Sequence, residues 1–183
     1  MTDILILDYD PTWPLLFESL RQPLWNVVSD FAIAIEHVGS TSVPGLVAKP
    51  IIDVDVVVPD GEVAAAIARL APLGYIHRGD LGIPQREAFT NPAGLPPHHL
   101  YVCPQCTPAL ANHLAVRDYL RAHPFAVSEY GELKKRLARE YAEDIDGYVE
   151  AKSAFLAGVL RAAGFADDAL AAIENLNRRR TVV

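Results

Sequence analysis

The spacing of apolar and polar positions divides the chain into two parts. In the first part, stretches with the 3.6-residue period of an amphipathic helix alternate with short runs of β-branched residues, which are typical of buried strands. The elements expected there are a helix over 10–28, a strand over 31–38, a loop from 39, a strand over 51–58, a helix over 63–73 and shorter strands over 75–103. Beyond this part the pattern is helical, with stretches over 108–122, 126–145, 147–164 and 167–177.

This order of elements predicts an α/β (α+β) fold, in which a mixed β-sheet with flanking helices is followed by a C-terminal helical region. We expect the mixed core to occupy residues 1–107, and the helical region to occupy residues 108–183 and to pack on that core. A ligand pocket is expected between the two parts, because clefts between layers commonly hold binding sites.

Composition narrows the classes of function. Hydrophobic residues make up 51% of the 183 residues and charged residues 21%, which is enough apolar surface for a sizeable core. The net charge of −7 repels nucleic-acid backbones at long range, so we expect no general nucleic-acid binding, whereas a local basic pocket can still hold a small phosphorylated ligand. The sequence shows no secretory signal and no membrane-spanning run, and two cysteines are too few for a disulfide framework. We therefore expect a cytoplasmic protein without membrane association.

Asp53 and Asp55 are the first candidates for chemistry. They lie two residues apart in the predicted strand over 51–58, so both side chains point to one face of the sheet. The residues around them are apolar, and two neighbouring carboxylates in such surroundings repel each other unless a cation lies between them. Carboxylate oxygens suit Mg²⁺, which binds one or two protein carboxylates together with phosphate oxygens and water. We predict that both aspartates are metal ligands and catalytic residues.

The loop before this strand has the features of a phosphate site. Gly39 has no Cβ, so the backbone N–H groups beside it can approach a ligand closely. Ser40 and Ser42 add hydroxyl groups, and N–H groups at the start of a helix bind anions. Lys49 adds a positive charge nearby. The predicted phosphate-binding or nucleotide-binding residues of this segment are Gly39, Ser40, Ser42 and Lys49.

This segment resembles the signature of the nucleotidyltransferase superfamily, in which a hydrophobic residue and Gly-Ser precede an Asp-x-Asp pair in an apolar strand. Val38-Gly39-Ser40 and Asp53-Val54-Asp55 match that pattern. The fuller string EHVGSTSVPGLVAKPIIDVDVVV is similar to the GrpB family, a branch of that superfamily. Other segments that resemble the family are residues 9–13, 82–84, 86–89, 98–102, 113–121, 133–134 and 148–152. The resemblance implies a nucleotidyltransferase-like protein that uses Mg²⁺ and binds a nucleoside triphosphate.

The chain departs from that pattern at one point. Nucleotidyltransferases usually bring a third carboxylate from a later strand, whereas the matching strand here, residues 98–102, offers histidines. His99 is a candidate for contact with a metal or a phosphate. Imidazole is a poor ligand for Mg²⁺ and a better one for Mn²⁺, so Mn²⁺ is the alternative cofactor. Glu87 is the next candidate for a substitute acid, and the missing carboxylate bears on catalysis more than on binding.

Two arginines are further candidates for phosphate binding. Arg86 either clamps a phosphate with its planar guanidinium or pairs with an acid such as Glu87. Arg117 either lines the same pocket from the helical region, together with His113, or pairs with Asp118 on a solvent-facing surface.

The remaining polar features have simpler interpretations. The run 134–136, Lys-Lys-Arg, is of the kind that usually faces solvent. Lys152 lies in an apolar stretch and either points inward toward an acid or sits on an exposed turn. Cys103 and Cys106 form a lone C-x-x-C, for which zinc binding needs two more ligands and redox activity needs a helix start after a strand, so coincidence is the favoured interpretation.

Three functions follow from these patterns. The first is a metal-dependent, nucleotidyltransferase-like enzyme that binds a nucleoside triphosphate or another phosphorylated small molecule and acts on an unidentified acceptor. The second is a non-catalytic module that binds the same ligand without turnover. The third is an accessory or scaffold domain for a partner protein, which an exposed apolar stripe within residues 126–164 would support.

Overall fold

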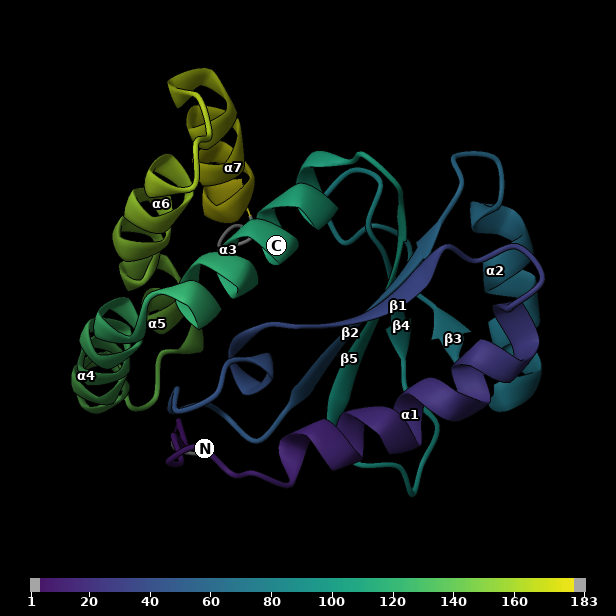
Figure 1. Cartoon of the computed structure of the whole chain (residues 1–183), viewed down its shortest axis with the longest axis horizontal. Helices are drawn as coiled ribbons and strands as arrows, with labels where there is room; N and C mark the ends of the chain where they lie inside the picture. Colours follow the sequence, from purple (N-terminus) through teal and green to yellow (C-terminus); the bar gives the residue numbers. More distant parts are fainter. Residues whose placement is uncertain (1–3, 180–183) are drawn as a thin grey trace.

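The computed structural model describes residues 4–179 and is built around a five-stranded sheet in the order β1-β2-β5-β4-β3 (Figure 1). The strands are β1 (Ala34–Val38), β2 (Ile52–Val58), β3 (Ile76–His77), β4 (Glu87–Thr90) and β5 (His98–Pro104). The helices are α1 (Trp13–Val28), α2 (Val63–Leu70), α3 (Pro108–Ala122), α4 (Pro124–Glu140), α5 (Ile145–Ala151), α6 (Ser153–Ala162) and α7 (Asp167–Arg179), with short 3-10 turns η1 (Ser40–Ser42) and η2 (Ala71–Leu73). The expected mixed α/β fold is confirmed.

The sheet is mixed, with its only parallel pair among the described strands at the centre, between β2 and β5. In that pair Asp53 lies opposite His99 and Asp55 lies opposite Tyr101. Because side chains alternate along a strand, Asp53 and Asp55 point to one face of the sheet and Val54 points to the other.

Helices α1 and α2 cover the face to which Val54 points (Figure 1). The apolar stripe of α1, which includes Trp13 and Leu24, packs there with Leu70 of α2. This layer forms the largest group of fully buried side chains, so it supplies most of the hydrophobic stabilisation that holds β2 in place.

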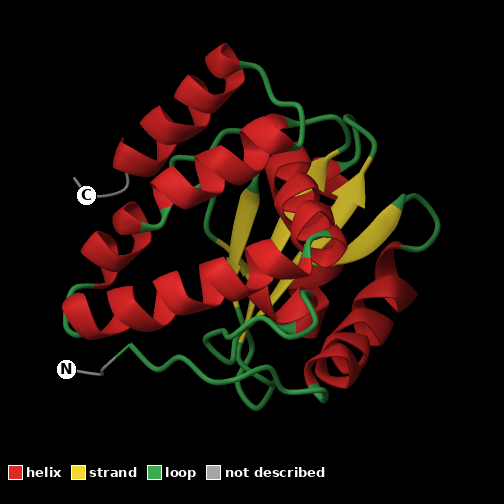
Figure 2. Cartoon of the chain, turned by 60° about the vertical axis from the view of Figure 1, so that its left-hand side comes forward, coloured by secondary structure: helices red, strands yellow, loops and turns green. Residues whose placement is uncertain are grey.

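Helix α3 covers the opposite face, and α4 to α7 lie beyond it (Figure 2). Leu110 of α3 packs there on Val57 of β2 and Cys103 of β5. A separate apolar cluster joins the segment after η1 to the helical region, through Val43, Leu46, Leu120, Tyr130 and Val159. The loop between β1 and β2 is thereby fixed between the sheet and the C-terminal helices.

Two elements begin later than the apolar pattern predicts. The first helix begins at Trp13, because the carboxylate of Asp10 accepts the backbone N–H of Thr12 and closes a turn ahead of it. The first strand begins at Ala34, because the N–H groups of residues 31–32 still donate to the carbonyl of the last α1 residue.

The predicted helices over 126–145 and 147–164 also differ in their limits. The first ends at Glu140, because Asp144 accepts the N–H of Gly147 at 2.9 Å and caps a new helix, α5. The second is divided at Lys152 into α5 and α6. The apolar periodicity continues through the boundary after Glu140 and through Lys152, so periodicity alone reveals neither helix boundary.

Candidate functional site

Strand β2 exposes its two aspartates to different degrees. The side chain of Asp53 is 28% exposed, and that of Asp55 is completely buried. Both lie on the α3 side of the sheet, so the prediction that they share one face is confirmed.

A histidine from strand β5 holds Asp53. His99 Nδ1 lies 2.8 Å from Asp53 Oδ1, as the parallel register between the two residues allows. The ring of His99 is half exposed. The ring contacts Asp53 through Nδ1, and this hydrogen bond holds the orientation of the carboxylate.

A second histidine, from α3, holds Asp55. His113 Nδ1 lies 2.8 Å from Asp55 Oδ2, whereas Asp55 Oδ1 has no hydrogen-bond partner among the described residues. Burial lowers the pKa of His113, but the charge of Asp55 and the hydrogen bond to it outweigh burial, so that the pKa is raised above 6.5. Each aspartate of the pair therefore has a histidine of the protein as its hydrogen-bond partner.

The backbone at Gly39 lies directly against Asp53. Gly39 has a φ of 68°, in the left-handed region, and a Cβ added there would overlap the carboxylate of Asp53. Glycine is therefore required at this position for two reasons, the backbone conformation and the close approach to Asp53.

The two serines of the loop have different roles. Ser40 Oγ accepts a hydrogen bond from Lys134 Nζ at 2.7 Å. Ser42 is buried and donates its hydroxyl to the carbonyl of Gly39 at 2.6 Å, so it fixes the turn rather than facing a ligand. Ser40 lines the cavity described below, whereas Ser42 is not among its lining residues.

Lys134 contradicts the expectation that its basic run faces solvent. It is 2% exposed and donates to both Ser40 Oγ and the carbonyl of Val47. Burial, together with the charge of Lys152, lowers the pKa of Lys134 to about 7. Lys135 and Arg136 of the same run do face solvent, whereas Lys134 lies on the face of α4 that packs against the β1–β2 loop.

Two more lysines approach the same place. Lys49 and Lys152 lie 5.4 Å and 4.3 Å from the centre of the Tyr148 ring. Burial and the charge of Lys49 lower the pKa of Lys152 to about 8, while the charge of Asp53 opposes this shift. Among the described residues, no carboxylate lies within ion-pair distance of any of these three lysines. Of the two alternatives for Lys152, the structure shows the inward one, because Lys152 lines a cavity and lies over the Tyr148 ring. Within the described part of the chain, the acid that was expected to pair with it is not within ion-pair distance.

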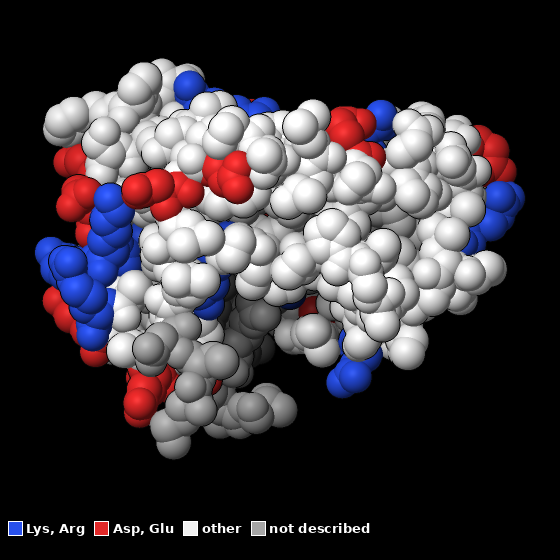
Figure 3. Space-filling view, turned by 90° about the horizontal axis from the view of Figure 1, so that it is seen from below, with Lys and Arg blue, Asp and Glu red and all other residues white. Residues whose placement is uncertain are grey.

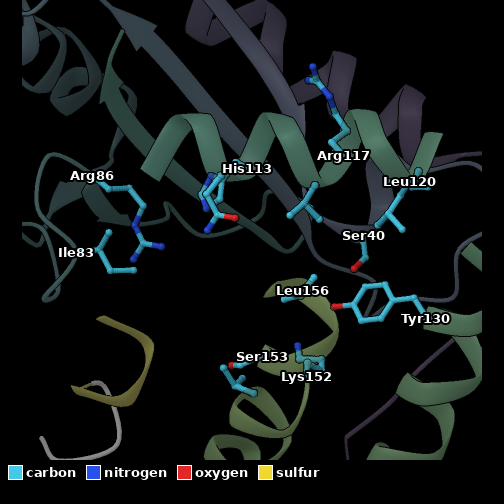
Figure 4. Close-up of a pocket in the computed structure, with 15 residues that line it drawn as sticks. Ser40, Ile83, Arg86, His113, Arg117, Leu120, Tyr130, Lys152, Ser153 and Leu156 are labelled. Atoms are coloured by element: carbon cyan, nitrogen blue, oxygen red, sulfur yellow. The ribbon is translucent and has the colours of Figure 1, made fainter. Parts of the chain in front are cut away.

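A cavity of about 290 Å³, called here the polar cavity, lies between α3 and the start of α6 (Figure 4). Ser40 and Tyr130 lie at one end and Arg86 lies at the other, with His113 above and Lys152 below. This is the boundary between sheet and helical region at which a pocket was expected.

The two candidate arginines differ in this cavity. Arg86 is buried, stacks on the Tyr101 ring at 4.2 Å and points toward the cavity (Figure 4). Arg117 lines the wall with its stem, but its guanidinium turns away and binds Glu36 at 2.6 Å and Asp118 at 2.7 Å. Arg117 therefore serves chiefly to tie α3 to β1, which matches the paired alternative.

The residues present suit a metal only in part. Among the described residues, no group of three or more His, Cys, Asp or Glu side chains is arranged to hold a metal ion. Glu87, the substitute acid, bonds His77 at 2.5 Å. The buried Asp55 Oδ1, which lacks a partner, is suited to an ion that takes its other ligands from phosphate and water, as Mg²⁺ does.

The remaining candidates lie outside this site. Cys103 is buried and Cys106 is exposed, and neither forms a disulfide. On the face shown in Figure 3, the Lys and Arg side chains of the described residues are interspersed with acidic ones, most visibly at the end formed by the C-terminal helices. No helix within the described part of the chain has the length and apolar character that a membrane crossing requires.

The fold and the site together define a mixed α/β protein with a histidine-supported aspartate pair beside a cavity that contains several cationic side chains. The family model described as "GrpB protein" matches residues 3–162, and the chain belongs to this family. The crystal structure of conserved protein GrpB from Enterococcus faecalis is 34% identical, has a TM-score of 0.77, and is matched over 87% of this chain and 96% of that one.

Curated relatives support the same assignment. UPF0157 protein YqkA of Bacillus subtilis is 36% identical over 82% of this chain and 44% of its own length. A UPF0157 protein of Pseudomonas aeruginosa is 36% identical over 85% of this chain and 65% of its own length. The chain thus spans between about half and two thirds of the length of these two relatives.

Proposed function

We propose that this protein binds a nucleoside triphosphate, or another phosphorylated small molecule, in the polar cavity, and that with the triphosphate it transfers the nucleotidyl group to an acceptor and releases pyrophosphate. The observation that carries the proposal is the contact between Lys134 and Ser40, which brings a buried amino group, and positive charge when that group is protonated, to the loop beside the aspartates. That arrangement matches the needs of phosphoryl chemistry, in which cations offset the charge of the phosphates.

The lysines favour an anionic ligand for an electrostatic reason. Lys49, Lys134 and Lys152 lie close enough that each of the latter two has its pKa lowered by its lysine neighbours. Such a group of like charges is costly when it is buried without acidic partners, and a bound phosphate group offsets that cost. Arg86, at the other end of the cavity, adds a planar group suited to phosphate oxygens.

The aspartates favour a divalent cation as part of the same site. Asp53 and Asp55 would hold Mg²⁺, or Mn²⁺, which would neutralise charge on the phosphates. His99 would orient Asp53, and Gly39 would allow the ligand to approach the backbone beside it. Asp53, being partly exposed, is the carboxylate that a ligand-bound cation meets first.

The experiment is a thermal-shift titration with each nucleoside triphosphate, with and without Mg²⁺ or Mn²⁺. A ligand at 100 times its Kd stabilises the fold by about 2.7 kcal/mol, which raises the melting temperature. We expect a metal-dependent shift in the wild type that Asp53→Asn abolishes. Asp60→Asn, an exposed position beyond the end of the same strand, is the matched control and should keep the shift. A shift that survives Asp53→Asn would remove the metal assignment.

The second candidate is a binding module without turnover. It is favoured by one observation, namely that β5 brings histidines to the aspartates and no third carboxylate. Release of pyrophosphate distinguishes the two, because a module binds the triphosphate but releases none with any acceptor. The scaffold alternative has less support, since the exposed large apolar side chains in 126–164 are Ile145 and Val149.

A further inference from the structure

A second cavity adjoins the polar cavity at the end that contains Arg86. It has a volume of about 240 Å³ and is called here the apolar cavity. The loop before β4, the start of α3 and the helix α7 enclose it. Its walls are mostly apolar side chains, among them Ile83, Pro108, Phe165, Ala169 and Ile173.

The two cavities adjoin each other along one face of α3. Ile83 and Asn112 line both of them. Ala109 of α3 faces the apolar cavity and Val116 faces the polar one, so the spacing along the helix keeps these residues on one side. A smaller cavity of about 30 Å³, which also includes Asn112, adjoins both.

The cavities differ in chemistry. The polar cavity is lined by Ser40, Arg86 and Lys152, whose groups suit an anion. The apolar cavity offers hydrocarbon along most of its wall, with Gln85 and Asn112 as its polar side chains. A single ligand that fills both would therefore carry an anionic group at one end and an apolar group at the other.

We propose that the apolar cavity binds the apolar part of the small molecule whose phosphate lies in the polar cavity, so that this ligand is amphipathic. This inference rests on the proposed phosphate site. The occupant is an alkyl or ring substituent of the phosphorylated molecule. Because Ile83 and Asn112 line both cavities, a phosphate in one cavity and an apolar substituent in the other lie close enough to belong to one molecule.

The test uses inorganic phosphate and a series of n-alkyl phosphates, from methyl to octyl, titrated by calorimetry into the full chain. Each methylene that enters an apolar cavity strengthens binding about fourfold. We expect affinity to rise by this factor over several consecutive chain lengths, and then to level off when the cavity is filled.

Two variants fill the cavity from opposite walls. Ala169→Phe acts from α7 and Ala109→Phe acts from α3, so one remains informative if the other fails to fold. Either should abolish the gain with chain length while inorganic phosphate binds as in the wild type. Ala171→Phe, the same change at an exposed position of α7, is the control and should retain the gain.

The outcomes separate the two proposals. If phosphate and every alkyl phosphate fail to bind while nucleoside triphosphate still gives its metal-dependent thermal shift, this inference fails and the proposed function stands; if the triphosphate gives no shift either, both fail. If phosphate binds but affinity is flat from methyl to octyl, the apolar subsite is wrong and the phosphate site stands. A gain with chain length that survives both filling variants also overturns the inference, because the chain must then lie elsewhere.

Discussion

The side-chain nitrogen of Lys134 lies 2.7 Å from the hydroxyl oxygen of Ser40, which joins a helix of the C-terminal region to the loop in front of the aspartate strand. The lysine is buried and its other bond is to the carbonyl of Val47, so both of its partners belong to one loop. This contact fixes the distance between the helical region and the candidate site, and it makes the protonation of Lys134 part of the stability of the fold.

Lys134→Met should weaken the pH dependence of stability. The folded-state pKa of Lys134 is lowered to about 7 from 10.5, so between these values the unfolded chain binds more protons than the folded one. The free energy of unfolding therefore rises with pH across that window, by about 1.4 kcal/mol per pH unit from this residue. Below pH 7 none of this gain in stability is present. Urea unfolding from pH 6.5 to 10 should show a smaller slope in the variant.

The neighbouring lysine supplies the control for that measurement. Lys135 is 42% exposed, so Lys135→Met should leave the slope as in the wild type. Lys152 contributes to the slope in the same direction above about pH 8, so the Lys134 variant keeps a residual dependence. Equal slopes for wild type and Lys134→Met would show that the lysine is not buried as the structure has it.

Gly39→Ala should disrupt the site more than an equivalent change nearby. Gly39 and Gly45 both have positive φ, so either substitution costs about 1–2 kcal/mol of stability. A Cβ at Gly39 would also displace Asp53, whereas one at Gly45 meets nothing within 4 Å. We expect Gly39→Ala to lose the metal-dependent thermal shift with nucleoside triphosphate and Gly45→Ala to keep it. Loss in both, or in neither, would contradict the packing of Gly39 on Asp53.

Asp55→Asn should lower the pKa of His113. In the wild type the carboxylate outweighs burial and keeps that pKa raised above 6.5, so without the charge the effect of burial remains and the pKa falls below 6.5. NMR titration of the imidazole reports both values. We also expect a loss of about 1–3 kcal/mol in the free energy of unfolding, because a buried partner is removed. An unchanged His113 pKa in Asp55→Asn would disprove the pairing of His113 with Asp55. Asp60→Asn is the control and should leave the His113 pKa as in the wild type.

The two cysteines should differ in reactivity toward a thiol reagent. Cys103 is buried against Leu110, and burial raises the pKa of its thiol, whereas Cys106 is exposed. Native protein should therefore react at one thiol and urea-unfolded protein at two, and Cys106→Ser should remove the native reaction. Rapid labelling of both thiols in the native state would contradict the packing of β5 beneath α3.

Local pattern was sufficient for the parts of the fold that repeat with a fixed period. The β-branched run around Asp53 and Asp55 indicates a buried strand, and their spacing of two places both carboxylates on one face, as observed. The helix predicted over 108–122 has the limits that the structure shows. In these cases the determining interactions are short-range, so the sequence by itself determines the element and the direction of its side chains.

Only the tertiary structure decided which distant residues meet at the site. His113 lies 58 residues after Asp55, and Lys134 lies 94 residues after Ser40, yet each pair is in hydrogen-bond contact. A lysine in a basic run on a helix is ordinarily solvated, and it becomes buried here because α4 packs that turn against the loop. Periodicity specifies the face on which a side chain lies, whereas its partner, its burial and therefore its pKa depend on how the helices pack on the sheet.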